Sequence, residues 1–188
     1  IMPTLLATCL ALWLVKRHKR LDAPQYALVV AFVVAMVVSK ALQGWLGGVW
    51  LMLGAFLPVV VLFVLVAGLT DTVARHRAFM TGLALFTLFL AAHGVDQSIA
   101  GVGWSGAQLS QGTRIMYLGI FNDPNDLALA FVIALPMLAY LLATAKRFTG
   151  RIFWLAGMGL LLYGIFLTNS RGGMLSAAAQ FLAFCVGR

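Results

Sequence analysis

Charged side chains are scarce in this sequence. Only 10% of the 188 residues are charged and five are acidic, whereas a typical soluble domain has about 25% charged residues. The hydrophobic share is 63%, and the mean hydropathy is +1.01. A soluble fold of this length has too little interior to bury so much apolar surface. This excludes a soluble globular protein, and we predict an all-α, polytopic bundle of about seven transmembrane helices.

Cysteine is equally rare. Cys9 and Cys185 both lie inside apolar runs and form no CxxC pattern, so we interpret them as small core residues rather than as a disulfide or a metal site. The net charge of +8 is compatible with binding nucleic acid. The basic residues, however, form short clusters between apolar runs and are not gathered on one amphipathic face. This is the pattern of membrane topology, and we expect no nucleic-acid partner.

Seven apolar runs are candidate membrane spans, some of them short enough to need snorkelling ends. They are Met2–Val15, Ala23–Ser39, Val49–Leu69, Ala78–Ala92, Leu127–Ala145, Ile152–Thr168 and Met174–Val186. The basic KRHKR segment at 16–20 follows the first run rather than preceding it, so that run is not a signal peptide. We expect residues 1–188 to be part of a single transmembrane domain, with the first and last runs truncated.

The basic residues also orient the predicted spans. If the spans alternate in direction, ten of the thirteen Lys and Arg residues fall on one side of the membrane. The positive-inside rule makes that side cytoplasmic. The exceptions are Lys40, Arg114 and Arg171, which fall on the outer side. Lys40 closes a short span and can snorkel to the headgroups, whereas Arg114 and Arg171 stand beside polar motifs.

The longest predicted connection runs from 93 to 126 on the outer side and is rich in glycine. A long connection among short ones is more often functional than disordered. Trp104 and Tyr117 are candidate anchors at the headgroup level. His93, where the connection begins, is compatible with a catalytic base, but a lone histidine at the end of a span is more often an interfacial residue.

The connection ends in GIFNDPND, residues 119–126, directly before an apolar run. Asp123 and Pro124 have the types preferred at the N-cap and first position of a helix, and Asp126 is placed to bond back to the cap. This explains the two acids but neither Asn122 nor Asn125. Alternatively, the free N–H groups of this helix start, with Arg114 nearby, bind an anion. A metal held by the two aspartates is a third, less favoured interpretation.

A second motif is LTNSRGGML, residues 167–175, at the outer end of the sixth predicted span. Arg171 follows Asn169 and Ser170, and we expect the glycine pair after it to allow a tight turn. A charge at this depth is expensive unless it has a partner, so the arginine is either a functional residue or a snorkelling one. The small residues of SAAAQ (176–180) predict close packing of the last span.

The two motifs, in this order, resemble a pattern in bacterial O-antigen ligases and O-antigen polymerases, which share one membrane domain. There, an arginine precedes a G-x-F-x-[ND]-P-N stretch that opens a span, and S-R-G follows about two spans later. The matching residues here are Arg114, the segment 119–125 and the segment 170–172. The resemblance covers roughly residues 110 to 186; the earlier spans match only as generic membrane helices.

The resemblance implies a multi-pass glycosyltransferase of the bacterial inner membrane, active at the periplasmic face in lipopolysaccharide or polysaccharide biosynthesis. Its donor would be a glycan on undecaprenyl diphosphate, and its acceptor lipid A core, another glycan or a protein. Catalysis would need no metal or other cofactor. Residues implied to bind substrate are Arg114, Asn122, Asp123, Asn125, Ser170 and Arg171. The family's catalytic histidine would lie in a later periplasmic loop beyond Arg188, so we expect this fragment alone to be inactive.

Two other classes of function remain open. One is a secondary transporter, and the other is a non-catalytic subunit of a polysaccharide export system. Transporters typically show internal repeats and interrupted helices with polar residues near the midplane. The two halves of this sequence show no such repeat, and Pro58 and Pro136 are the only residues that indicate an interruption.

Overall fold

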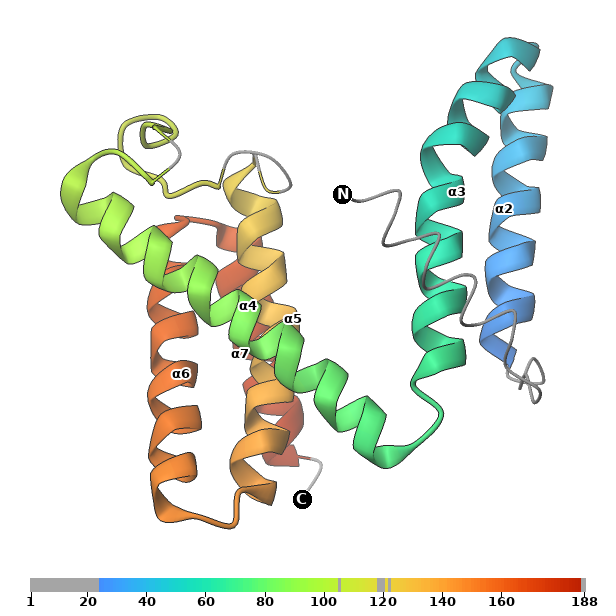
Figure 1. Ribbon diagram of the computed structural model, residues 1–188. Coiled ribbons are helices and arrows are strands. Elements are labelled where there is room, and N and C mark those ends of the chain that lie inside the picture. Colours follow the sequence, from blue (N-terminus) through green and yellow to red (C-terminus); the bar gives the residue numbers. More distant parts are fainter. Residues whose placement is uncertain (1–23, 105, 118–120, 122, 187–188) are drawn as a thin grey trace. The chain divides into compact units, whose positions relative to one another are not determined.

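The computed structural model describes residues 24–104, 106–117, 121 and 123–186. Within these ranges it contains six helices and no β-strand (Figure 1), which confirms the predicted all-α fold. The helices are α2 (Pro24–Leu42), α3 (Leu46–Leu69), α4 (Val73–Ala100), α5 (Pro124–Thr144), α6 (Phe148–Leu167) and α7 (Arg171–Val186). The predicted span 2–15, the basic segment 16–20, Cys9 and Asn122 lie outside the described residues.

Of the described helices, α2 to α6 are each long and apolar enough to cross a membrane, and α7 is a shorter apolar helix of 16 residues. The chain is therefore a helical membrane protein. The largest departure from the predicted spans is α4, whose 28 residues exceed the ~20 needed to span. It continues past His93 to Ala100, so the connection to α5 begins at residue 101 rather than at His93.

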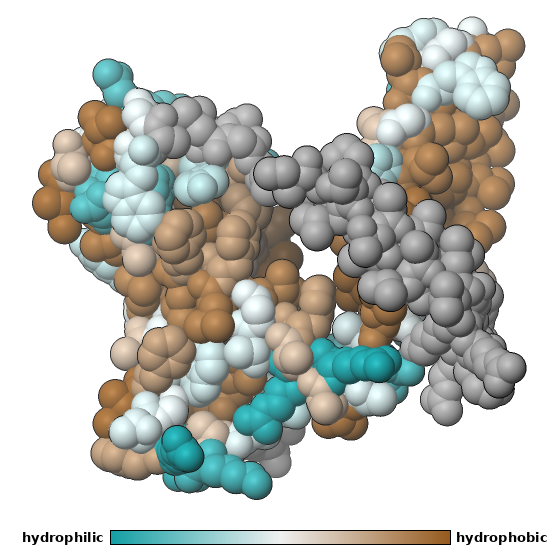
Figure 2. All heavy atoms as spheres, in the orientation of Figure 1, coloured by the Kyte–Doolittle hydropathy of each residue, from teal (hydrophilic) through white to brown (hydrophobic). Residues whose placement is uncertain are grey.

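The chain divides into two compact units, residues 1–76 and 77–188. In the first unit, α2 packs against α3 through aromatic pairs, of which Tyr26–Phe63 has ring centroids 5.7 Å apart. Gly48 and Leu65 are the only buried residues of this helix pair. Its apolar flanks are exposed (Figure 2), as expected for helices whose surroundings are lipid or other spans.

The second unit has a continuous core, in which α5 packs against α6 and α7. Phe131 of α5 is fully buried at its centre, beside Gly164 of α6. A Cβ at Gly164 would lie 2.9 Å from the Phe131 ring, closer than side chains tolerate. Small residues of this kind let membrane helices approach closely. The residues of this core are Ala84, Leu88, Leu90, Ala91, Ile115, Leu127, Phe131, Val132, Ala134, Leu135, Leu138, Leu141, Leu161 and Ile165.

A side chain of α7 completes the backbone hydrogen bonding of α5. Pro136 lies inside α5 and has no N–H, so the carbonyl of Val132, four residues earlier, lacks its usual donor within the helix. The Gln180 Nε2 amide of α7 donates to that carbonyl at 3.2 Å. The helix therefore stays continuous through its proline because a neighbouring helix supplies the missing donor.

Candidate functional site

The start of α5 has the cap that the sequence predicts. Asp123 has an extended backbone, and its Oδ1 accepts the Asn125 N–H at 2.8 Å, with Pro124 next in the first helical position. Asp126 does not complete the expected return bond, because its carboxylate has no hydrogen-bond partner among the described residues. Asp123 therefore has a structural role as the cap, whereas the described residues supply no partner for the Asp126 carboxylate.

The start of α7 is capped by Ser170. This side chain is only 3% exposed, and its Oγ accepts the Gly173 N–H at 3.2 Å. The turn before it is made by Asn169, which has a positive φ of 53°. The expectation that the glycine pair makes the turn is therefore wrong, since Gly172 and Gly173 lie inside the first turn of α7.

The two glycines of α7 have different surroundings. A Cβ at Gly173 would lie 2.8 Å from the Ala128 Cβ of α5, whereas a Cβ at Gly172 would meet nothing within 4 Å. Gly173 therefore allows the first turns of α5 and α7 to touch. As a result, two helix N-termini, each with free N–H groups and a positive dipole end, lie close together.

Arg114 joins the two motifs. Its Nε donates to the backbone carbonyl of Thr168 at 2.8 Å, and its Nη2 donates to Asn125 Oδ1 at 2.9 Å. Beside it, the Ile115 N–H donates to the carbonyl of Leu167. The structure thus brings Arg114 and Asn125 to the turn that leads into Arg171. Arg114 is already engaged with the protein, although a guanidinium has more N–H donors than these two.

Arg171 is placed differently. It is the first residue of α7, it is exposed, and it has no hydrogen-bond partner among the residues that the structure describes. Among the other basic residues of the second unit near helix ends, Arg77 lies near the start of α4, and Lys146, Arg147 and Arg151 lie where α5 ends and α6 begins, at the opposite ends of these two helices. Arg171 is therefore the available cation at the α5–α7 end of this unit, within the described residues.

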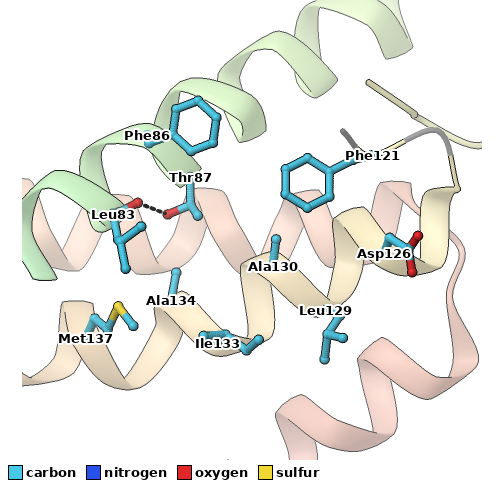
Figure 3. A pocket seen from close by; sticks show the side chains of 10 residues that line it. All are labelled: Leu83, Phe86, Thr87, Phe121, Asp126, Leu129, Ala130, Ile133, Ala134 and Met137. Carbon is cyan, nitrogen blue, oxygen red and sulfur yellow. Dashed lines mark hydrogen bonds between the residues drawn. The ribbon is translucent and has the colours of Figure 1, made fainter. Parts of the chain in front are cut away.

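Two hollows flank the start of α5. A hollow of about 290 Å³ with a mixed polar and apolar lining lies between α5 and α7 (the α5–α7 hollow), and it is lined by Asn125, Leu129, Val132, Ser170, Gly172, Gly173 and Ser176. Ser176 is a lining residue that the sequence pattern does not reveal, because its place among small residues indicates only close helix packing. An apolar groove of about 480 Å³ lies between α4 and α5 (Figure 3), lined by Leu83, Phe86, Thr87, Phe121, Asp126, Leu129, Ala130, Ile133, Ala134 and Met137. Leu129 lines both hollows, and the Asp126 carboxylate lies at the connection end of the groove, near Phe121.

The connection itself is anchored on the last turns of α4. His93 is 1% exposed, and its Nε2 accepts the Trp104 N–H at 3.1 Å. The ring is therefore buried in protein, and its Nε2 acceptor is already engaged. Trp104 and Tyr117, the expected headgroup anchors, both pack edge-on against the His93 ring at 5.0 Å. Gln97, which sequence reasoning did not single out, is fully buried one turn further along α4.

Comparison with models of known protein families, with curated proteins and with solved structures found no match for this chain. The fold therefore defines the class of protein, a helical membrane protein. The resemblance to O-antigen ligases and polymerases rests on the two motifs alone.

Proposed function

We propose that this chain carries the donor-binding part of an enzyme that transfers an oligosaccharide from undecaprenyl diphosphate to an acceptor. The acceptor would be lipid A core, another glycan or a protein, at the periplasmic face of the bacterial inner membrane. The observation that carries the proposal is the meeting of the two motifs. Arg114 bonds to both, although Arg114 and Thr168 are 54 positions apart.

The arrangement suits an anionic leaving group. When a sugar leaves a diphosphate, negative charge develops on the phosphate oxygens, and fixed cations and N–H groups near that charge stabilise the transition state. Arg171 is an exposed cation that does not itself line the α5–α7 hollow but stands in the chain between Ser170 and Gly172, which do. The first turns of α5 and α7 add N–H groups and the positive ends of two helix dipoles. In this proposal Arg171 binds the diphosphate, and Arg114 holds the two helix starts together beside it.

The neighbouring groove suits the lipid part of such a donor. Its lining is apolar apart from Thr87 and Asp126, and the Thr87 hydroxyl is already bonded to carbonyls of its own helix. A hydrocarbon chain would therefore meet no unsatisfied polar group along most of the groove. Leu129 lines both hollows and is exposed, so in this proposal one amphiphile crosses over this side chain, with its head in the α5–α7 hollow and its chain in the groove.

The transporter alternative gains no support from the helices. α3 and α5 run without a break through Pro58 and Pro136, whereas transporter sites are typically built from discontinuous helices.

The test is made with the gene that encodes this chain in its own host. Arg171→Ala and Arg171→Lys are compared with Lys40→Ala, a matched control that removes another cation predicted to face outward. We expect Arg171→Ala to abolish surface polysaccharide or its attachment while the undecaprenyl-linked glycan accumulates. Arg171→Lys is also expected to be impaired, because lysine keeps the charge but lacks the planar fork of arginine.

The Lys40 variant should retain normal surface glycan. Immunoblots of the membrane fraction must show equal protein levels for the comparison to hold. Normal surface glycan in cells that carry Arg171→Ala would contradict the assignment of Arg171 to the donor site.

A further inference from the structure

Two polar side chains are buried near the end of α4, in a helix that is otherwise largely apolar. His93 is 1% exposed and Gln97 is 0% exposed, and they lie one helical turn apart on the same face. Buried polar groups of this kind cost free energy unless they are hydrogen-bonded. The hydrogen-bond partners of His93 and Gln97 therefore indicate what these two buried side chains do.

Among the described residues, the hydrogen-bond partners of both side chains lie in the α4–α5 connection. His93 Nε2 accepts the Trp104 N–H at 3.1 Å. Gln97 Nε2 donates to the carbonyl of Ala107 at 3.1 Å, and Gln97 Oε1 accepts the Met116 N–H at 3.0 Å. With a longer bond of 3.5 Å from Gln97 Nε2 to the Gln108 carbonyl, two side chains of α4 thus hold four backbone groups of a segment that otherwise has little regular structure.

The fixed part of the connection ends at the residues that join the two motifs. The Met116 N–H donates to Gln97. Ile115, which precedes Met116, donates its N–H to the carbonyl of Leu167. Arg114, which precedes Ile115, donates to Thr168 and Asn125. The hydrogen bonds therefore run without a gap from α4 to the helix starts of α5 and α7.

We propose that His93 and Gln97 are positioning residues that lock the connection onto α4 and so set the place of Arg114, and that protonation of His93 releases this lock. The effect of this lock on activity rests on the proposed function. The lock itself is a statement about structure, and it can be tested without any activity.

The sensitivity to pH follows from the ring nitrogens. Because Nε2 accepts a hydrogen bond, the neutral ring carries its proton on Nδ1, which is buried and has no hydrogen-bond partner among the described residues. Protonation places a hydrogen on Nε2, where it points at the Trp104 N–H and removes the acceptor. It also leaves a cation in a buried site. Both effects favour opening as the pH falls.

The surroundings of the ring leave it little freedom to avoid this conflict. The titratable and charged groups that the described residues bring near it are Asp96 of α4, which accepts the Trp104 indole N–H at 2.6 Å, and the Tyr117 phenol. A Cβ at Gly103 would lie only 2.7 Å from Nε2. The Gly103 backbone therefore lies close to Nε2, at a distance where a larger residue would not fit.

The test is hydrogen–deuterium exchange on the whole chain in phospholipid nanodiscs, read in peptides that cover residues 104–117. His93→Phe keeps a planar ring but removes the acceptor, and we expect exchange there to rise roughly fivefold, the factor that corresponds to one net hydrogen bond. His93→Gln supplies a neutral acceptor and should restore protection. His76→Phe, an exposed histidine of the same helix, is the matched control and should behave like the wild type.

The second arm changes pH. Between about pH 8 and pH 5, exchange corrected for its intrinsic rate should rise in the wild type and in His76→Phe and stay flat in His93→Phe and His93→Gln. A wild-type connection whose protection does not change with pH would overturn the role of protonation. Equal exchange in His93→Phe and wild type at pH 8 would overturn the lock. If His93→Phe does not fold, the wild type and His93→Gln still decide the question, because His93→Gln should remove the pH response while keeping the protection.

Failure of the glycan assay with Arg171 variants would leave these exchange results unaffected, so the two proposals can fail separately.

Discussion

The hydrogen bond between α7 and the proline-containing helix α5 makes a quantitative prediction. Gln180→Leu replaces the amide with an apolar side chain of similar size and so removes the donor to the Val132 carbonyl. Hydrogen bonds between membrane helices contribute about 0.6 kcal/mol on average and up to about 1.7 kcal/mol, and a buried carbonyl left unsatisfied costs about 1–3 kcal/mol. The 3.2 Å contact is at the long end of the usual range. We therefore expect a loss of about 1 kcal/mol in the free energy of unfolding.

A double-mutant cycle with Pro136→Ala identifies the cause. Alanine restores the N–H at position 136, which can donate to the same carbonyl within α5. Gln180→Leu should then cost less than half as much as it does with proline present. The assay is denaturant unfolding in mixed micelles, followed by circular dichroism, with all four proteins measured under one condition. An equal cost of Gln180→Leu in the two backgrounds would refute the reasoning, because the glutamine would then contribute through packing alone.

Two further predictions concern the helix starts. Gly173→Ala should lower the free energy of unfolding and weaken the packing of α7 on α5, because its Cβ would lie 2.8 Å from the Ala128 Cβ. Gly172→Ala should be neutral or slightly stabilising. Thermal unfolding compares the two variants, and equal melting temperatures would contradict this prediction. Asp123→Ala should cost about 1 kcal/mol by loss of the cap, while Asp126→Ala should cost clearly less. The same denaturant assay measures both, and an equal loss would mean that Asp126 also caps the helix.

The features that could be predicted from the sequence are the local ones, namely the apolar spans and the helix cap. The spans follow from runs of apolar residues, because every backbone group in lipid must be bonded within its own segment. The cap at Asp123 and Pro124 follows from preferences that act over three or four residues. The prediction for the glycine pair of α7 failed, since the left-handed backbone of the turn belongs to Asn169. Asparagine adopts that conformation more readily than most other non-glycine residues, so residue types alone did not decide between Asn169 and the glycines.

By itself, the sequence determined that this is a helical membrane protein and where most of its described helices lie, because hydropathy and capping act locally along the chain. Only the tertiary structure decided that Arg114 bonds across 54 positions to Thr168 and that His93 is a buried acceptor. It also decided that position 173, unlike position 172, has no room for a side chain larger than that of glycine. These properties depend on which residues meet when helices pack, and no pattern within a single segment carries that information.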